Sequence, residues 1–244
     1  MLACAARDPA ATRMSLCVAL AGLVASVAAA APLEDAVRAG SELVVRYRFV
    51  VRNRSAAEIA DAEVRVFAPL ERTSTQRTEV RRVSQPYRIE TDGNGNRVLV
   101  FALALAPHQS TGIVIDAAVE RAARPVPLSA GERERWLRAA PFVEVHDPLV
   151  RAVAGGLAGA TADEIARSAM DFVAGAVRME RYVAEDRGAV AALASGTGDC
   201  TESMYLFVAL LRGRGVPARG VEGFVLHGSS VLRADDLHNW AEFH

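Results

Sequence analysis

The sequence has 244 residues, 51% of them hydrophobic, and its 28 basic and 29 acidic side chains give a formal net charge of −1. Without an excess of positive charge the chain is poorly suited to follow a nucleic-acid backbone, so we expect no nucleic-acid partner. The apolar fraction is too high for a disordered chain, and 18 glycines and 10 prolines are too few for a fibrous one. At roughly 150 residues per domain, the length allows one large or two modest domains.

The N-terminus has the pattern of a signal peptide. Arg13 precedes an uncharged apolar stretch, residues 14–31, that ends in small residues suited to a cleavage site. We therefore predict a signal peptide over residues 1–31 and an exported protein, periplasmic or secreted, whose mature chain has no membrane contact. The alternative is an uncleaved anchor helix, because the stretch is just long enough to cross a bilayer.

From about residue 41 to 120, within a domain that we place at residues 32–124, apolar and polar side chains alternate with a period of two, which predicts strands. The apolar faces of the expected strands are Val45, Tyr47, Phe49 and Val51; Val64 and Val66; Leu99, Phe101, Leu103 and Leu105; and Ile113, Ile115, Ala117 and Val119. The segment 92–96, Asp-Gly-Asn-Gly-Asn, predicts a hairpin turn because Gly and Asn accept positive φ angles. Short antiparallel strands with no helix between them predict a β-sandwich-like domain.

Beyond residue 124 the apolar period becomes helical. The prolines that open this part of the chain suit a linker. Ser129-x-x-Glu132 and Thr161-x-x-Glu164 are capping-box patterns, which mark the starts of helices. We therefore predict a linker and a helical segment over residues 125–181, with a scaffolding role.

The most informative stretch is Gly196-Thr-Gly-Asp-Cys200, in which the glycines permit a sharp turn. Asp199 and Glu202 form a capping-box-like pair that predicts a helix starting at Cys200. Apolar residues then recur at helical spacing, so we expect the thiol to lie on the core-facing side, shielded from bulk water. A helix N-terminus favours the thiolate, which is the nucleophilic form. The other cysteines fall in the predicted signal peptide, and a buried structural role for Cys200 is the alternative.

After this helix, residues 218–226 and 237–243 have strand patterns. Alternation places His238, Trp240 and Glu242 on one face of the second strand. A histidine on a strand beside a helix that carries a cysteine can form a thiolate–imidazolium pair. A purely structural histidine is the alternative.

From about residue 182 to the end, these motifs resemble the transglutaminase-like superfamily, a papain-like group of cysteine acyl-transfer enzymes. The matching residues are Arg187-Gly188-Ala189, Gly196-x-Gly198-Asp199-Cys200, Glu202, Gly215-Val216-Pro217-Ala218-Arg219, Gly223-Phe224 and His238-x-Trp240-Ala241-Glu242. The resemblance implies an α+β fold in which an antiparallel β-sandwich precedes a papain-like or transglutaminase-like α+β core. It places that core at residues 182–244 and makes it incomplete at its C-terminus.

By this resemblance Cys200 is the nucleophile, His238 is its base and Trp240 walls the site, with Asp199 and Glu202 in supporting positions. The third triad residue of the family, an Asp on the following strand that orients the histidine, is absent from this sequence.

Two other groups of polar residues are weaker candidates. Asp235 and Asp236 are too close to His238 in sequence to take the role of the absent Asp, and we interpret them as solvated loop charges. His227 and His244 have no metal-binding spacing with Cys200, so we expect no metal ion.

The resemblance implies thiol-mediated acyl transfer on protein or peptide amides, a reaction that needs no cofactor, with hydrolysis favoured over crosslinking. Because the third triad residue is missing, the alternative is a catalytically inactive transglutaminase-like module with a binding or assembly role.

Overall fold

The computed structural model describes residues 42–92, 94–121, 126–181, 185–225, 228–232 and 237–244. The predicted signal peptide, His227, Asp235 and Asp236 lie outside the described residues. The described residues divide into two compact units. Unit 1 lies within residues 42–126 and 228–232, and unit 2 lies within residues 127–225 and 237–244.

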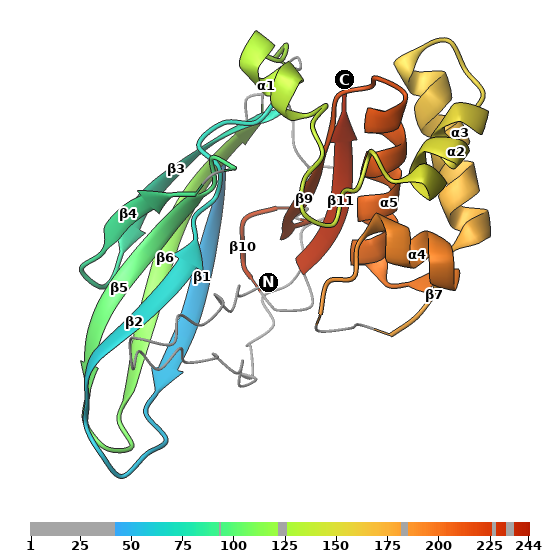
Figure 1. The fold of residues 1–244 in the computed structure, drawn as a ribbon. Coiled ribbons are helices and arrows are strands. Elements are labelled where there is room, and N and C mark those ends of the chain that lie inside the picture. The colour runs from blue at the N-terminus through green and yellow to red at the C-terminus, as the bar shows by residue number, and fades with distance from the viewer. Residues whose placement is uncertain (1–41, 93, 122–125, 182–184, 226–227, 233–236) are drawn as a thin grey trace. The chain divides into compact units, whose positions relative to one another are not determined.

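Unit 1 consists of strands arranged in two sheets (Figure 1). The strands are β1 (Glu42–Arg52), β2 (Ile59–Phe67), β3 (Gln76–Val83), β4 (Arg88–Thr91), β5 (Arg97–Leu105), β6 (Ser110–Arg121) and β10 (Ser230–Val231). One sheet has the order β10-β1-β6-β3 and the other β2-β5-β4. All strand pairs of unit 1 are antiparallel except β1 with β10, which are parallel. Strand β10 comes from a part of the chain more than 100 residues beyond β6.

The two sheets of unit 1 share one apolar core, as expected for a sandwich. Strands β5 and β6 contribute most of it, because alternate residues of each strand face inward. Leu99, Phe101, Leu105, Ile113 and Ile115 are essentially fully buried. The predicted apolar faces of these strands are therefore confirmed.

The turn between β4 and β5 is built by Asp92. Its Oδ1 accepts the backbone amides of Asn94 at 2.9 Å and Asn96 at 2.8 Å, and Gly95 has a φ of 86°. Such local side-chain bonds are the reason that Asp and Asn favour turns. The hairpin predicted at residues 92–96 is confirmed.

Unit 2 combines helices with short strands (Figure 1). Its elements are α1 (Ala130–Arg135), α2 (Pro148–Gly156), α3 (Ala162–Ala176), β7 (Arg178–Met179), α4 (Ala189–Ser195), β8 (Thr197–Gly198), α5 (Cys200–Gly213), β9 (Ala218–Phe224) and β11 (Leu237–Phe243). Strands β9 and β11 are antiparallel, and β7 and β8 are parallel. The capping boxes predicted at Ser129/Glu132 and Thr161/Glu164 are both present.

Helix α5 is the central element of unit 2. Leu206, Val208, Ala209, Leu210 and Leu211 have no exposed surface, because α2, α3, α4 and the β9–β11 pair pack around the helix. Figure 1 shows β9 and β11 running beside α5. Burial of the leucine and valine side chains, at about 1.5–3 kcal/mol each, makes α5 the scaffold on which the rest of the unit is assembled.

The far end of α5 is bound to β9 by a half-buried cation. Arg212 Nε donates to the carbonyl oxygen of Ala218 at 2.8 Å, and its Nη1 donates to the carbonyl oxygen of Arg138. Burial lowers the pKa of Arg212 to about 10. The guanidinium therefore stays charged at neutral pH and keeps both bonds.

Asn53, at the end of β1, is a buried polar anchor of unit 1 with 0% exposure. Its Nδ2 donates to the carbonyl oxygens of Ala57, Leu105 and Ala106, and its Oδ1 accepts from Ser55. The sequence Asn53-Arg-Ser55 matches a glycosylation sequon, but an amide nitrogen held in this way is inaccessible to modification.

We expect Asn53→Ala to lower the free energy of unfolding of unit 1 by about 2 kcal/mol or more, because it leaves buried carbonyl groups unpaired. Urea unfolding of the full chain, followed by far-ultraviolet circular dichroism, measures this change. Arg54→Ala, at the exposed position next to Asn53, is the matched control and should change stability by about 0.5 kcal/mol or less. Equal effects of the two substitutions would contradict the anchoring role.

Tyr47 makes unit 1 sensitive to alkaline pH. Burial raises the pKa of Tyr47 to about 12, above the value near 10 of an unfolded tyrosine. A raised folded-state pKa gives stability that is present below the unfolded value and is lost as pH rises through the folded value. We therefore expect stability to fall between about pH 10 and about pH 12, and Tyr47→Phe to flatten that fall in denaturant titrations. An unchanged slope in the variant would refute this assignment.

Candidate active site

Helix α5 begins at Cys200, as predicted, and Asp199 caps it. Asp199 Oδ1 accepts the amide of Thr201 at 2.7 Å, and Glu202 Oε2 accepts the amide of Asp199 at 3.1 Å. These two bonds satisfy amides that have no partner inside the helix. The predicted capping box of Asp199 and Glu202 is therefore confirmed.

The thiol of Cys200 is exposed, so the expectation that it is shielded from bulk water is wrong. The buried side chains at the start of α5 are those of Thr201, 2% exposed, and Glu202, 1% exposed. Because a helix turns by about 100° per residue, burial of these two neighbours turns Cys200 outward. The apolar packing of the helix starts one turn later, at Met204.

Each glycine of the Gly-x-Gly-Asp-Cys stretch has its own structural reason. Gly196 ends α4 with a φ of 64°, a left-handed conformation that glycine adopts without steric penalty. Gly198 has no room for a side chain, because a Cβ there would lie 2.6 Å from the Cβ of Glu202. The second glycine thus allows the Glu202 carboxylate to fold back over the start of the helix.

The Glu202 carboxylate is also bound by the segment that precedes α4. The amide of Arg187 donates to Glu202 Oε1 at 3.1 Å, and Arg187 Nη2 lies 3.3 Å from Glu202 Oε2 and 3.3 Å from Glu180 Oε2. The hydrogen bond to Glu202 is the main cause that raises the pKa of Arg187. Loss of Arg187 would leave a buried charge without compensation, which is strongly unfavourable.

The start of α4 is completed by a residue distant in sequence. Gly188, the N-cap, has no side chain to accept the first amides, and Glu144 Oε2 accepts the amide of Ala189 at 3.0 Å instead. A Cβ at Gly188 would lie 2.7 Å from Glu144 Oε1. The Arg187-Gly188-Ala189 motif therefore has a packing role that local sequence does not reveal.

Tyr205 fixes the same segment from α5. Its hydroxyl donates to Asp186 Oδ2 at 2.9 Å, and its ring stacks on Phe142 with 5.5 Å between centroids. Burial, reinforced by the Asp186 carboxylate, raises the pKa of Tyr205. The phenol is therefore a hydrogen-bond donor throughout the neutral range.

The side chain closest to the thiol among the described contacts is that of Asn239, in β11. Asn239 Nδ2 lies 2.8 Å from Thr201 Oγ1 and 3.9 Å from Cys200 Sγ. Asn239 shares the α5-facing side of β11 with Ala241 and Phe243, which pack against the core of unit 2. Asn239 is not among the predicted site residues, although strand alternation places it on the face of β11 opposite to His238 and Trp240.

His238 lies on the opposite face of β11 from Asn239, in agreement with the predicted grouping of His238 with Trp240 and Glu242. His238 is exposed and pairs with Gly223 of β9. Gly223 has room for no side chain because the Trp240 ring covers it, at 2.8 Å from the position of a Cβ. Glu242 accepts a hydrogen bond of 2.7 Å from Arg219.

Cys200 and His238 belong to adjoining parts of unit 2, because His238 is the neighbour of Asn239 in the chain. Successive Cα atoms are about 3.8 Å apart, so the backbone of His238 is close to the residue that approaches Sγ. No hydrogen bond between the Cys200 thiol and the His238 ring occurs within the described part of the chain. Asp235 and Asp236 are outside it.

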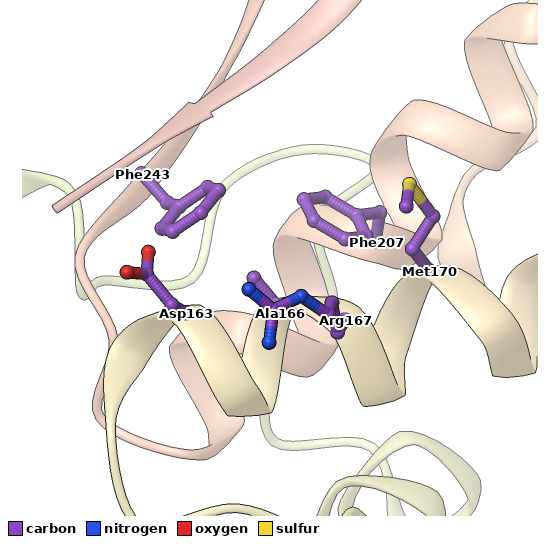
Figure 2. Close-up of a pocket in the computed structure, with 6 residues that line it drawn as sticks. All are labelled: Asp163, Ala166, Arg167, Met170, Phe207 and Phe243. Carbon is purple, nitrogen blue, oxygen red and sulfur yellow. The ribbon is translucent and has the colours of Figure 1, made fainter.

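A separate shallow pocket of about 310 Å³ lies between α3, α5 and the end of β11 (Figure 2). Figure 2 shows the rings of Phe207 and Phe243 above α3, with Asp163, Ala166, Arg167 and Met170 along the helix. The lining includes none of the predicted site residues, and neither Thr201 nor Asn239, which lie beside the thiol. The pocket is therefore distinct from the surroundings of the thiol.

The described residues contain no group of three or more His, Cys, Asp and Glu side chains arranged to hold a metal ion. Within the same residues, no helix combines the length and the apolar character needed to cross a bilayer.

A family model of the transglutaminase-like superfamily matches residues 149–244. The predicted resemblance to this superfamily is thereby confirmed for that part of the chain. The match starts in α2, so it includes helices that precede the motifs from which the resemblance was predicted. A comparison with curated proteins gives no match.

Solved structures give the fold of the chain. A candidate cysteine protease from Cytophaga hutchinsonii superposes with a TM-score of 0.57 and 15% identity, over 83% of this chain and 72% of that one. The periplasmic domain of TgpA from Pseudomonas aeruginosa superposes with a TM-score of 0.43 and 19% identity, over 88% and 72%. The likeness to the Cytophaga hutchinsonii structure, together with the sheets of unit 1, confirms the predicted α+β fold with a β-rich N-terminal part.

We expect Gly198→Ala to lower the free energy of unfolding by about 1–3 kcal/mol, because the added methyl group overlaps the Glu202 side chain. Gly155→Ala, in α2, is the matched control, since nothing lies within 4 Å of its added Cβ. That control should be neutral or stabilising by up to about 1 kcal/mol, because alanine favours helix. Thermal unfolding of both variants checks the difference, and a tolerated Gly198→Ala would refute the packing role.

Proposed function

We propose that this protein is an exported cysteine-dependent enzyme that transfers acyl groups from the amide bonds of protein or peptide substrates. The observation that carries the proposal is the exposed thiol of Cys200 at the N-terminus of α5, inside the region that matches the transglutaminase-like superfamily. Superfamily members act on protein or peptide amides, which is the basis of the proposed substrate class.

In the proposed reaction, Cys200 Sγ attacks the carbonyl carbon of the substrate amide, and the thiol proton passes to the His238 imidazole. A bond forms between sulfur and carbon, and the carbonyl oxygen becomes an oxyanion. When the C–N bond breaks, His238 returns the proton to the leaving amine and a thioester remains on Cys200. Water then attacks the thioester carbonyl carbon and His238 takes a proton from the water. The C–S bond breaks, His238 returns the proton to the sulfur, and a carboxylic acid leaves the regenerated Cys200 thiol.

The position of Cys200 supports the role of nucleophile. The amide dipoles of α5 converge on its first residue and favour negative charge there, on the thiolate and on the oxyanion that follows. Asp199 and Glu202 keep that residue at the start of the helix by closing the capping box. We therefore assign them supporting roles.

The assignment of His238 as the base is supported by its neighbourhood and exposure. It adjoins Asn239, which approaches the thiol, and its ring is exposed on the opposite face of β11, so the proposed proton transfer requires the ring to move towards the thiol when substrate binds. Trp240 lies on the same face of β11 as His238. We assign it the role of a wall of the site, as the resemblance to the superfamily implies.

Hydrolysis is favoured over crosslinking because the thiol is exposed, which gives water direct access to a thioester formed on it. Export is proposed from the apolar stretch of residues 14–31 alone. The chemistry requires no cofactor.

We expect the full-length chain to hydrolyse labelled casein and Cys200→Ala to reduce the rate by about 10³-fold or more, because no acyl-enzyme can form. His238→Ala should reduce it by about 10²–10⁴-fold, the usual contribution of a general base. Incorporation of a fluorescent monoamine into casein, measured in parallel, reports transamidation, and we expect it to be the slower reaction.

His146→Ala is the control, because His146 is an exposed histidine of the same unit outside the proposed site. It should hydrolyse casein at the wild-type rate. If neither reaction depends on Cys200, acyl transfer is wrong and the non-catalytic binding or assembly module becomes the better description.

A further inference from the structure

Asn239 occupies a position for which neither the superfamily match nor the proposed acyl transfer gives a reason. It lies between His238 and Trp240 in sequence, but on the side of β11 that faces α5. The other residues on that side, Ala241 and Phe243, are apolar and pack against the core. A polar amide at the start of this face therefore requires a polar partner.

The partners of Asn239 are the first two side chains of α5. Its Nδ2 is 2.8 Å from the hydroxyl oxygen of Thr201, which is buried, and 3.9 Å from the sulfur of Cys200, which is exposed. A primary amide nitrogen carries two N–H donors, so one nitrogen can serve both acceptors at the same time. The Thr201 bond holds the amide in place, and the same nitrogen lies within reach of the nucleophile for its second N–H.

An N–H donor stabilises a thiolate more than it stabilises a thiol. Hydrogen bonds to an ionised acceptor are shorter and roughly twice as strong as those between neutral groups. A fixed donor beside Sγ therefore stabilises the anion more than the protonated form. The helix dipole acts in the same direction, and the two effects meet at the same atom.

We propose that Asn239 is a thiolate-stabilising and positioning residue: anchored by Thr201, it donates a hydrogen bond to Cys200 Sγ and stabilises the thiolate as it forms. This inference rests on the proposed function, because it concerns the same nucleophile. The two faces of β11 then have different roles, because Asn239 stabilises the sulfur anion and His238 transfers the protons.

The decisive substitution is Asn239→Asp. Aspartate has nearly the same shape, and it accepts a hydrogen bond from the Thr201 hydroxyl, so the attachment of β11 to α5 is kept. It has no N–H donor, however, and it places a negative charge beside the sulfur. Asn239→Ala removes both the donor and the anchor.

The measurement is the rate at which iodoacetamide alkylates Cys200 in the full-length protein at neutral pH, followed by mass spectrometry of the peptide that contains Cys200. The peptide readout separates Cys200 from Cys4 and Cys17. We expect Asn239→Ala to alkylate about three- to tenfold more slowly than the wild type, and Asn239→Asp about tenfold or more. Both differences should vanish at alkaline pH, where every thiol is ionised.

Thr201→Ser and Thr201→Val are a matched pair of controls. Serine keeps the hydroxyl that anchors Asn239 and should alkylate as the wild type does, whereas valine removes it and should slow alkylation. In urea, all variants should react at the same rate, because the effect depends on the fold.

If Asn239 had only a structural role, its substitution would loosen the packing around Cys200 and would leave the alkylation rate unchanged or increase it. Wild-type or faster alkylation of Asn239→Asp at neutral pH would overturn the proposal. The alkylation result is independent of the casein assay. If the Asn239 variants alkylate slowly but the wild type does not hydrolyse casein, the role of Asn239 stands and acyl transfer is wrong. If the wild type hydrolyses casein but the Asn239 variants alkylate at its rate, only the role of Asn239 is wrong.

Discussion

The buried carboxylate of Glu202 joins the segments that surround Cys200. One oxygen closes the start of α5 through the amide of Asp199, and the other accepts the amide of Arg187, whose guanidinium balances the charge. Gly198 lacks a side chain because the Glu202 side chain occupies that space. Since a buried charge is tolerated only when it is paired and hydrogen-bonded, these residues constrain one another. The turn before Cys200 has its shape for this reason.

This constraint has a chemical consequence at the thiol. The helix buries Thr201 and Glu202 at its first turn and so turns Cys200 outward. The sulfur is therefore open to solvent while the backbone beneath it is held by hydrogen bonds on several sides. A nucleophile needs both properties, because it must reach a substrate and must not move when the substrate arrives. The apolar part of α5, from Met204 onward, supplies the rigid support.

Much of this arrangement could be predicted from neighbouring residues in the chain. The alternation in β5 and β6, the turn at Asp92 and the caps at Ser129, Thr161 and Asp199 all involve residues within a few positions of one another. The shielding of Cys200 was predicted wrongly from the same kind of pattern. Helical spacing gives the direction of a side chain, but it does not reveal that a buried carboxylate displaces the apolar stripe at the first turn.

The sequence by itself determined where several of the strands and helices begin, that Cys200 starts a helix, and which superfamily the last part of the chain resembles. Only the tertiary structure decided that Glu144 completes the start of α4, that the chain after β9 supplies β10 to a sheet of unit 1, and that Asn239 approaches the sulfur. The physical reason is range. Caps, turns and periodicity depend on bonds between close neighbours in the chain, whereas these contacts join residues tens of positions apart, whose meeting depends on the packing of whole elements.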